Sequence, residues 1–129
     1  MSSTILFVGA LFAQSALAQS AGTIVTVEAN PNRVDVGYAE LVANQPLEAI
    51  ARIKANTQLE RDDPAALINL GTASARLGRI NDAKSYFRAA IVSQNRFDLE
   101  LADGSWLDSR RAARKANALL ETGAVLALR

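Results

Sequence analysis

The chain contains neither cysteine nor histidine among its 129 residues. It therefore has no disulfide, no thiolate nucleophile, no imidazole base and none of the nitrogen or sulfur ligands that zinc prefers. Aromatic residues are also scarce, at 5% of the chain with a single tryptophan. These absences leave carboxylates as the main groups that could carry catalysis, and we expect neither a metal nor a cofactor.

An excess of charge of one sign is missing as well. The chain has 14 basic and 13 acidic residues, which give a formal net charge of +1. A nucleic-acid-binding domain usually carries a clear basic excess. We therefore expect no nucleic-acid partner.

The start of the chain carries no charged side chain before Glu28. Residues 5–13 form a short apolar run, and Ala16-Leu17-Ala18 matches the small-residue pattern of a signal-peptidase cleavage site. The run is too short to span a bilayer, which takes ~20 apolar residues. We expect residues 1–18 to be a cleavable signal peptide for export to the periplasm or the cell exterior, with no stable membrane insertion after cleavage. A membrane anchor and a buried helix are the alternative interpretations of this run.

The sequence repeats with a period of about 34 residues, which is typical of stacked helical repeats. A shift by this period aligns Gly37 with Gly71 and Ile53 with Phe87, and it also aligns Asn44 with Gly78 and Ala49 with Ala83.

Local helix signals fit this period. Asp63-Pro64 is typical of a helix start and Gly78 of a helix end. Asn81 can cap the next helix, so this stretch predicts two antiparallel helices joined at residues 78–80. Upstream, residues 36–43 and 46–58 predict a similar pair, with the turn at residues 44–45.

Gly71 lies inside one of these predicted helices, where glycine costs roughly 1 kcal/mol relative to alanine. A close approach of two helix backbones would compensate for that cost. We expect Gly71 and Ala83 to face each other, with Leu70 and Phe87 filling the seam between the helices.

The segment PAALINLGTASARLGRINDAKSYFRAAI (residues 64–91) resembles the tetratricopeptide repeat, a helix-turn-helix unit of about the same period. The resemblance implies a mainly α fold, an α–α superhelix of two hairpins over residues 30–63 and 64–97. It assigns roles in helix packing to Gly37, Ala49, Ile53, Leu67, Leu70, Gly71, Gly78, Ala83, Phe87 and Ala90. In this family the first helix of each pair lines a groove that holds a partner, and the corresponding residues here are Tyr38, Leu41, Ile68, Asn69, Thr72 and Arg76.

The region after the second hairpin, residues 98–122, predicts an extended segment followed by a helix. Apolar and polar residues alternate over residues 97–101, which indicates a short strand, and a second β segment is expected near residues 23–28. These two segments could pair. Residues 105–121 predict a capping helix over the open end of the repeats, with Trp106 as its main anchor and residues 123–129 as a tail.

Two clusters near this helix have alternative interpretations. Arg110, Arg111, Arg114 and Lys115 form a basic helix surface, which we interpret as a solvated face; an anionic partner is the alternative. Asp103 and Asp108 flank Trp106 in the pattern of a carboxylate sugar site, although a turn and a helix start explain both residues without chemistry.

The sequence therefore predicts a non-enzymatic protein–protein interaction module of the tetratricopeptide type, exported to the bacterial envelope, with a protein partner that the sequence does not identify. The alternative is a self-associating module, a homodimer in which a second copy completes the repeat stack. A carboxylate-only hydrolase ranks third.

Overall fold

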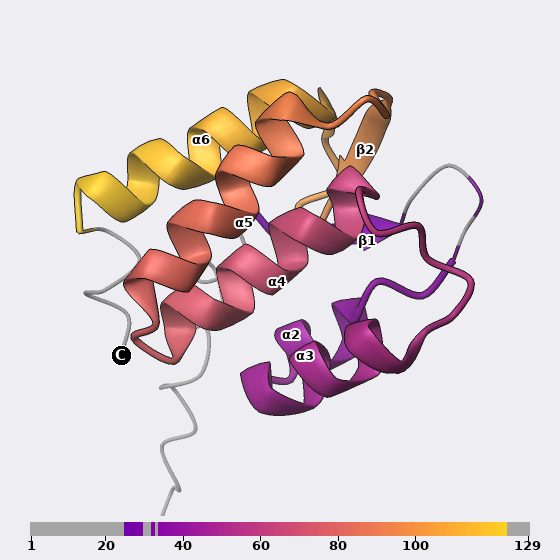
Figure 1. Ribbon diagram of the computed structural model, residues 1–129, viewed down its shortest axis with the longest axis horizontal. Coiled ribbons are helices and arrows are strands. Elements are labelled where there is room, and N and C mark those ends of the chain that lie inside the picture. The colour runs from indigo at the N-terminus through magenta and orange to yellow at the C-terminus, as the bar shows by residue number, and fades with distance from the viewer. Residues whose placement is uncertain (1–24, 30–31, 33, 124–129) are drawn as a thin grey trace, which may run out of the picture.

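Five helices and three short strands make up the described residues of the computed structural model, which are 25–29, 32 and 34–123. In chain order they are β1 (Val27–Ala29), α2 (Tyr38–Val42), α3 (Pro46–Ala55), α4 (Pro64–Arg76), α5 (Ile80–Val92), β2 (Asp98–Leu101), β3 (Trp106–Asp108) and α6 (Ser109–Glu121). Figure 1 shows α6 at one end of the molecule and α2 and α3 at the other, with α4 and α5 between them. The expected signal peptide and the tail beyond residue 123 lie outside the described residues.

The turns of the two helical hairpins have the same geometry. Gly78 adopts a left-handed conformation (φ 76°), and the N–H of Arg79 donates to the carbonyl of Ser74 at 2.9 Å. Asn44 also has a positive φ (55°), and the N–H of Gln45 donates to the carbonyl of Glu40 at 2.8 Å. This is the hydrogen-bond pattern in which a left-handed residue ends a helix. The two turns lie at positions that the sequence repeat aligns.

A glycine packs against the second helix in each hairpin. An added Cβ at Gly71 would lie 2.4 Å from Cε1 of Phe87, and one at Gly37 would lie 3.1 Å from Cδ1 of Ile53. The sequence repeat aligns both members of each pair, but the two glycines differ in conformation. Gly71 lies inside α4, whereas Gly37 precedes α2 with φ 73°, so the first helix is shorter than the predicted residues 36–43. The three atoms nearest to an added Cβ at Gly71 all belong to the Phe87 ring, so the closest neighbour of Gly71 is Phe87 and not the expected Ala83. Ala83 is also fully buried.

Helix α4 occupies the centre of the fold, and all of its residues from Pro64 to Ala75 are buried. Its start follows the sequence signals, since Asp63 accepts a hydrogen bond from the N–H of Ala66 (3.0 Å) and Pro64 takes the first turn. A helix surrounded on all sides must be apolar or small around its whole circumference. The many small residues of α4 fit this position, because α2, α3, α5, α6 and β1 all contact it.

Helix boundaries differ from the predictions at several ends. Helix α5 begins at Ile80, so Asn81 lies inside the helix and does not cap it. Helix α3 ends at Ala55, and the side-chain amide of Asn56 donates to the carbonyl of Asp35 at 2.9 Å. This hydrogen bond ties the end of α3 to the loop before α2, and the helix stops three residues before the predicted end at residue 58.

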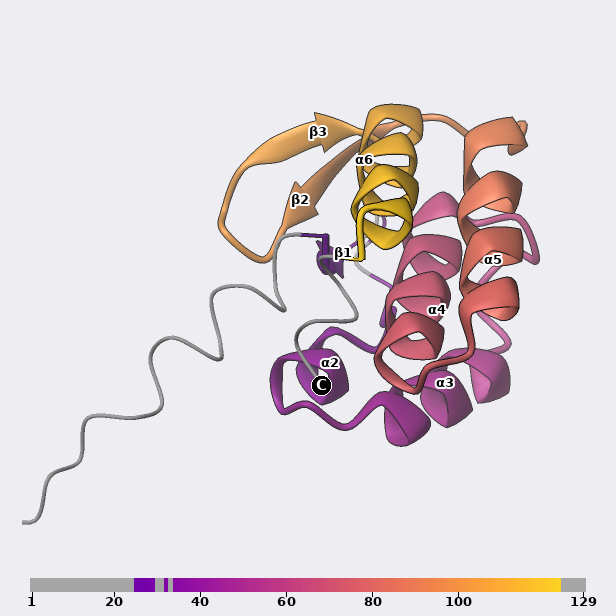
Figure 2. The same cartoon turned by 90° about the vertical axis from the view of Figure 1, so that its left-hand side faces the viewer.

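The three strands form one antiparallel sheet in the order β1-β2-β3. Val27 pairs with Leu101, so the two predicted β segments do pair with each other. Strand β3 was not predicted, and it takes Trp106 out of the expected capping helix. Figure 2 shows β2 and β3 extending to one side of the helices.

Helix α6 covers α5 and α4, but its anchors are not the expected one. Asp108 accepts a hydrogen bond from the N–H of Arg111 (3.2 Å), which starts the helix at Ser109. Trp106 is 64% exposed on β3 and does not anchor the helix. The buried side chains of α6 are instead Ser109, Ala112, Ala113, Ala116 and Leu120. Over the described ranges, no helix combines the length and the apolar character needed to cross a membrane.

Candidate interaction surface

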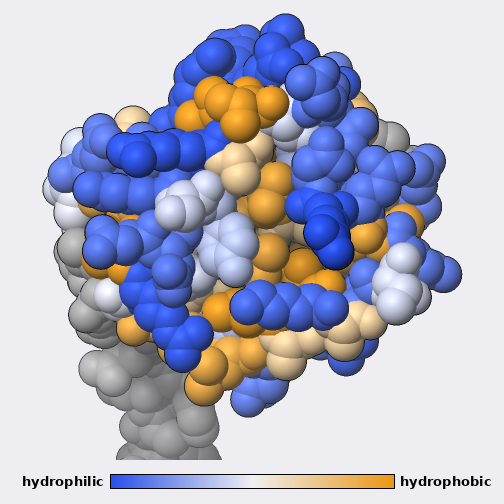
Figure 3. Space-filling view, viewed as in Figure 1, coloured by the Kyte–Doolittle hydropathy of each residue, from blue (hydrophilic) through white to orange (hydrophobic). Residues whose placement is uncertain are grey.

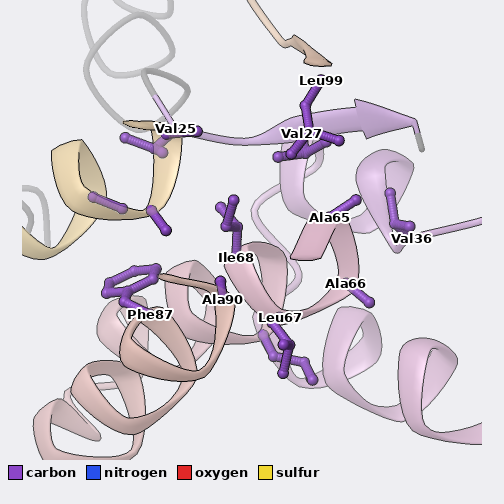
Figure 4. Close-up of a cluster of buried hydrophobic side chains, with 14 of the residues drawn as sticks. Val25, Val27, Val36, Ala65, Ala66, Leu67, Ile68, Phe87, Ala90 and Leu99 are labelled. Atoms are coloured by element: carbon purple, nitrogen blue, oxygen red, sulfur yellow. The ribbon is translucent and has the colours of Figure 1, made fainter. Parts of the chain in front are cut away.

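The six residues assigned to a partner groove do not line an open surface. Ile68 and Asn69 are fully buried, Leu41 is 1% exposed, and Thr72 is 8% exposed. Tyr38 and Arg76 are half-buried. Figure 4 shows Ile68 pointing from α4 toward the segment that carries Val25 and Val27. The chain itself therefore covers the face of α4 where the repeat pattern places a partner.

Asn69 fixes this arrangement through its side-chain amide. Its Oδ1 accepts from the N–H of Val27, and its Nδ2 donates to the carbonyls of Val27 and Val36, each at 2.8 Å. Thr72 adds a hydrogen bond from Oγ1 to the carbonyl of Val25 at 3.2 Å. A buried amide that satisfies three backbone groups holds β1 on α4 in one register. Both side chains serve the fold rather than an external ligand.

Arg76 completes the same face at the other end of α4. Its Nη1 donates to the carbonyl of Leu41 at 2.5 Å, and burial lowers its pKa. The guanidinium therefore ties α4 to the end of α2.

A shallow depression beside α2 and α3 is lined by ionised groups that contact one another. Arg52 donates to Asp35 (3.3 Å) and to Glu40, and the contact with Glu40 is the main cause that raises the pKa of Arg52. These contacts tie α3 to α2 and to the loop before it, which gives the three side chains a structural role. No group of acidic residues in the described part of the chain is arranged to hold a metal ion.

Exposed hydrophobic side chains mark the surfaces that lack such internal partners. Among the described residues, four large ones are exposed: Val42 (44%), Leu47 (54%), Val92 (73%) and Trp106 (64%). A single exposed aliphatic residue is ordinary, but an exposed tryptophan is large and is a residue type enriched at binding hot spots.

Trp106 stands on the outer face of the β2–β3 hairpin among carboxylates. It pairs across the strands with Glu100, and Asp98 pairs with Asp108 on the same face. Leu107 turns the other way, opposite the buried Leu99, so the hairpin presents an apolar inner side and a polar outer side. We call Trp106, Asp98, Glu100 and Asp108 the hairpin face.

Two of the nearby carboxylates have clear local roles. Nε of Arg96 donates to Oδ2 of Asp108 at 2.6 Å, and this contact holds the pKa of Asp108 below its ordinary value while Asp108 also caps α6. Oδ1 of Asp103 accepts from the hydroxyl of Ser105 at 2.6 Å and from its N–H at 2.9 Å. A helix cap and a turn thus account for both residues of the suggested sugar site.

The basic cluster of α6 lies beside this hairpin. Arg111, Arg114 and Lys115 are exposed, whereas Arg110 is half-buried and donates to the carbonyl of Ser93 at 3.2 Å. The hydrogen bonds from Ser105 are the main cause that lowers the pKa of Asp103, and the positive charge of Lys115 lowers it further. We call Arg111, Arg114 and Lys115 the basic face. Most of the upper surface in Figure 3, where α6 lies, is hydrophilic.

Sequence reasoning missed the hairpin because Trp106 also fits the helical spacing of the residues that follow it. The signal was present: the alternation of residues 98–101 is mirrored by residues 106–108 on the other side of the Asp103-Gly104 turn. Gly104 adopts φ 81° at that turn, which suits glycine.

Comparison with protein-family models, with curated proteins and with solved structures found no match. The assignment of function therefore rests on the surfaces of the chain itself, of which the hairpin face and the adjoining basic face are the best candidates.

Proposed function

We propose that the chain is a non-enzymatic protein–protein interaction module built from two tetratricopeptide-like hairpins and exported to the bacterial envelope. The repeated turn geometry at Asn44 and Gly78 and the repeated glycine contacts at Gly37 and Gly71 support the repeat assignment. The order of packing supports it too, because α6 packs on α5 and α4 as α4 packs on α3 and α2. The apolar run at residues 5–13 and the Ala16-Leu17-Ala18 pattern support export.

The single observation that carries the interaction role is the exposure of Trp106. The side chain is 64% exposed on a short edge strand, although the inner side of the same hairpin offers an apolar interior. Tryptophan contributes large contact area and is over-represented among residues that dominate binding energy. Since the groove positions of the family are covered by β1 here, a partner would bind the hairpin face instead.

Self-association is a second candidate. The acidic hairpin face and the basic face of α6 lie next to each other, and a second copy of the chain would offer the complement of both. In this case the protein partner is a second copy of the same chain.

A site-specific crosslinker tests the interaction role. A photo-activated amino acid replaces Trp106 in one variant and Arg88, an exposed residue of α5, in a control variant. We expect irradiation of producing cells to give discrete protein adducts from position 106 and none from position 88. Equal labelling from both positions, or no adduct from position 106, would contradict the proposal.

A further inference from the structure

The two faces beside the start of α6 carry opposite charge. The hairpin face holds the carboxylates of Asp98, Glu100 and Asp108 around Trp106, whereas Arg111, Arg114 and Lys115 line the exposed side of the helix that follows. A basic helix surface this close to an acidic aromatic one gives the molecule a self-complementary surface.

We propose that two copies of the chain form a closed twofold dimer in which the hairpin face of each copy contacts the basic face of the other. In a twofold interface each copy supplies both halves of every contact, so two complementary patches must lie near each other on one surface. The two faces adjoin at the start of α6, because Asp108 of the hairpin face accepts a hydrogen bond from the N–H of Arg111 of the basic face at 3.2 Å. This inference rests on the proposed interaction role and names the partner of the same surface.

The chemistry of the contact follows from the side chains. An arginine of the basic face can stack on the indole of Trp106, since tryptophan is the best aromatic partner for a guanidinium. The remaining cations would meet Asp98 and Glu100 of the other copy. Because the contact is charged and lies at the surface, the dissociation constant should rise with salt concentration.

Charge reversal on each face gives a sharp test. Asp98→Lys reduces the charge of the three carboxylates of the hairpin face from −3 to −1 and sets a cation against the basic face. Arg114→Glu reduces the charge of the three cations of the basic face from +3 to +1 and sets an anion against the hairpin face. Each variant alone should have a dissociation constant raised by about tenfold or more, because like charges across an interface are strongly unfavourable. An equimolar mixture should restore dimers, since one contact is then native and the other has both charges reversed.

The matched control is Arg88→Glu, which makes the same charge change at an exposed residue of α5, a helix that carries neither face. Light scattering during size-exclusion chromatography over about 1 µM to 1 mM would measure the dissociation constants over the range of weak interfaces. We expect native dimers, unaffected dimers for the control, and a heterodimer from the two reversed variants. A native mass that stays monomeric throughout, or a mixture that fails to dimerise, would overturn the inference.

The single tryptophan provides a second readout. We expect the emission of Trp106 to shift to shorter wavelength as protein concentration rises and the indole leaves water. An emission that does not change with concentration would overturn the dimer. The interaction role would then still be judged by crosslinking at position 106, so the two failures are distinguishable.

Discussion

The packing of Gly71 against Phe87 predicts that even one methyl group at this position destabilises the fold. The new Cβ would lie 2.4, 2.6 and 2.9 Å from Cε1, Cδ1 and Cζ of Phe87. The ring is 1% exposed and cannot move into solvent. Overpacking a core typically costs about 1–3 kcal/mol, whereas replacing a helical glycine by alanine gains about 1 kcal/mol in helix propensity.

The difference between these two terms is a net loss of about 0–2 kcal/mol, and three ring atoms within 3.0 Å of the new Cβ favour the upper half of that range. We therefore expect Gly71→Ala to lower the free energy of unfolding by about 1–2 kcal/mol, and Gly71→Leu to prevent folding at ordinary temperature. The first change corresponds to a fall in melting temperature of about 4–8 °C for each kcal/mol in a domain of this size. Urea and thermal unfolding followed by circular dichroism would measure both quantities.

A double-mutant cycle isolates the contact. Phe87→Leu removes the ring edge, so Gly71→Ala should be better tolerated in that background, with a coupling energy of about 0.5–3 kcal/mol. The control is Gly104→Ala, which has open space around its Cβ and is strained only by φ 81°. The changes in the free energy of unfolding caused by Gly104→Ala and by Phe87→Leu should therefore be additive, with no coupling energy. A Gly71→Ala variant as stable as the native chain would refute the close contact.

Three further substitutions test the other parts of the structure. Asn69→Ala leaves three buried backbone groups without partners and should lower the free energy of unfolding by about 3 kcal/mol in urea melts; a loss below about 1 kcal/mol would contradict its role in holding β1. Trp106→Ala should change that free energy by no more than about 0.5 kcal/mol, because the side chain is mostly exposed; a large loss would restore Trp106 as a core anchor. Arg96 holds the folded-state pKa of Asp108 below the unfolded value of about 3.9, so the contribution of Asp108 is complete above about pH 4 and is lost as pH falls through the folded pKa. Asp108→Asn keeps a helix cap without the charge, so the free energy of unfolding should fall less as the pH is lowered below about 4. Urea melts at several pH values would measure this, and a pH dependence equal to that of the native chain would contradict it.

The helices of the second hairpin were predictable because their signals are local. Asp63-Pro64 and Gly78 set the ends of α4 through capping geometry that depends on a few neighbouring residues. The glycine contact was predictable for a similar reason, since a helical glycine needs a compensating close approach and the sequence repeat pairs Gly71 with Gly37. Helix Ile80–Val92 exists as predicted but begins two residues before the start that a cap at Asn81 implies.

The filled groove was not predictable from periodicity. A stripe of apolar and small residues on a helix does not reveal whether it meets a partner protein or another segment of the same chain. Asn69 illustrates this. A polar residue in that stripe suggests a ligand contact, but its side-chain amide is hydrogen-bonded to the backbone of Val27 and Val36. That outcome depends on residues far away in the sequence, which no local pattern reports.

The fate of Trp106 depends on a competition between two local patterns. Helical spacing places it with Ala113 and Ala116, whereas alternation places it with Asp108 across from β2. The strand conformation is favoured because Leu107 then lies opposite the buried Leu99 and Asp108 caps the helix. The only tryptophan is thereby turned outward.

We propose that the chain makes its contacts through the surface around the hairpin and the first turns of α6, while β1 covers the face of α4 where a tetratricopeptide repeat would hold a partner. Hydrogen–deuterium exchange of the full chain at low and high protein concentration tests this location directly. We expect added protection at high concentration over residues 98–115 and none over α2 and α3. Protection confined to α2 and α3, or exchange that does not depend on concentration anywhere, would contradict the account.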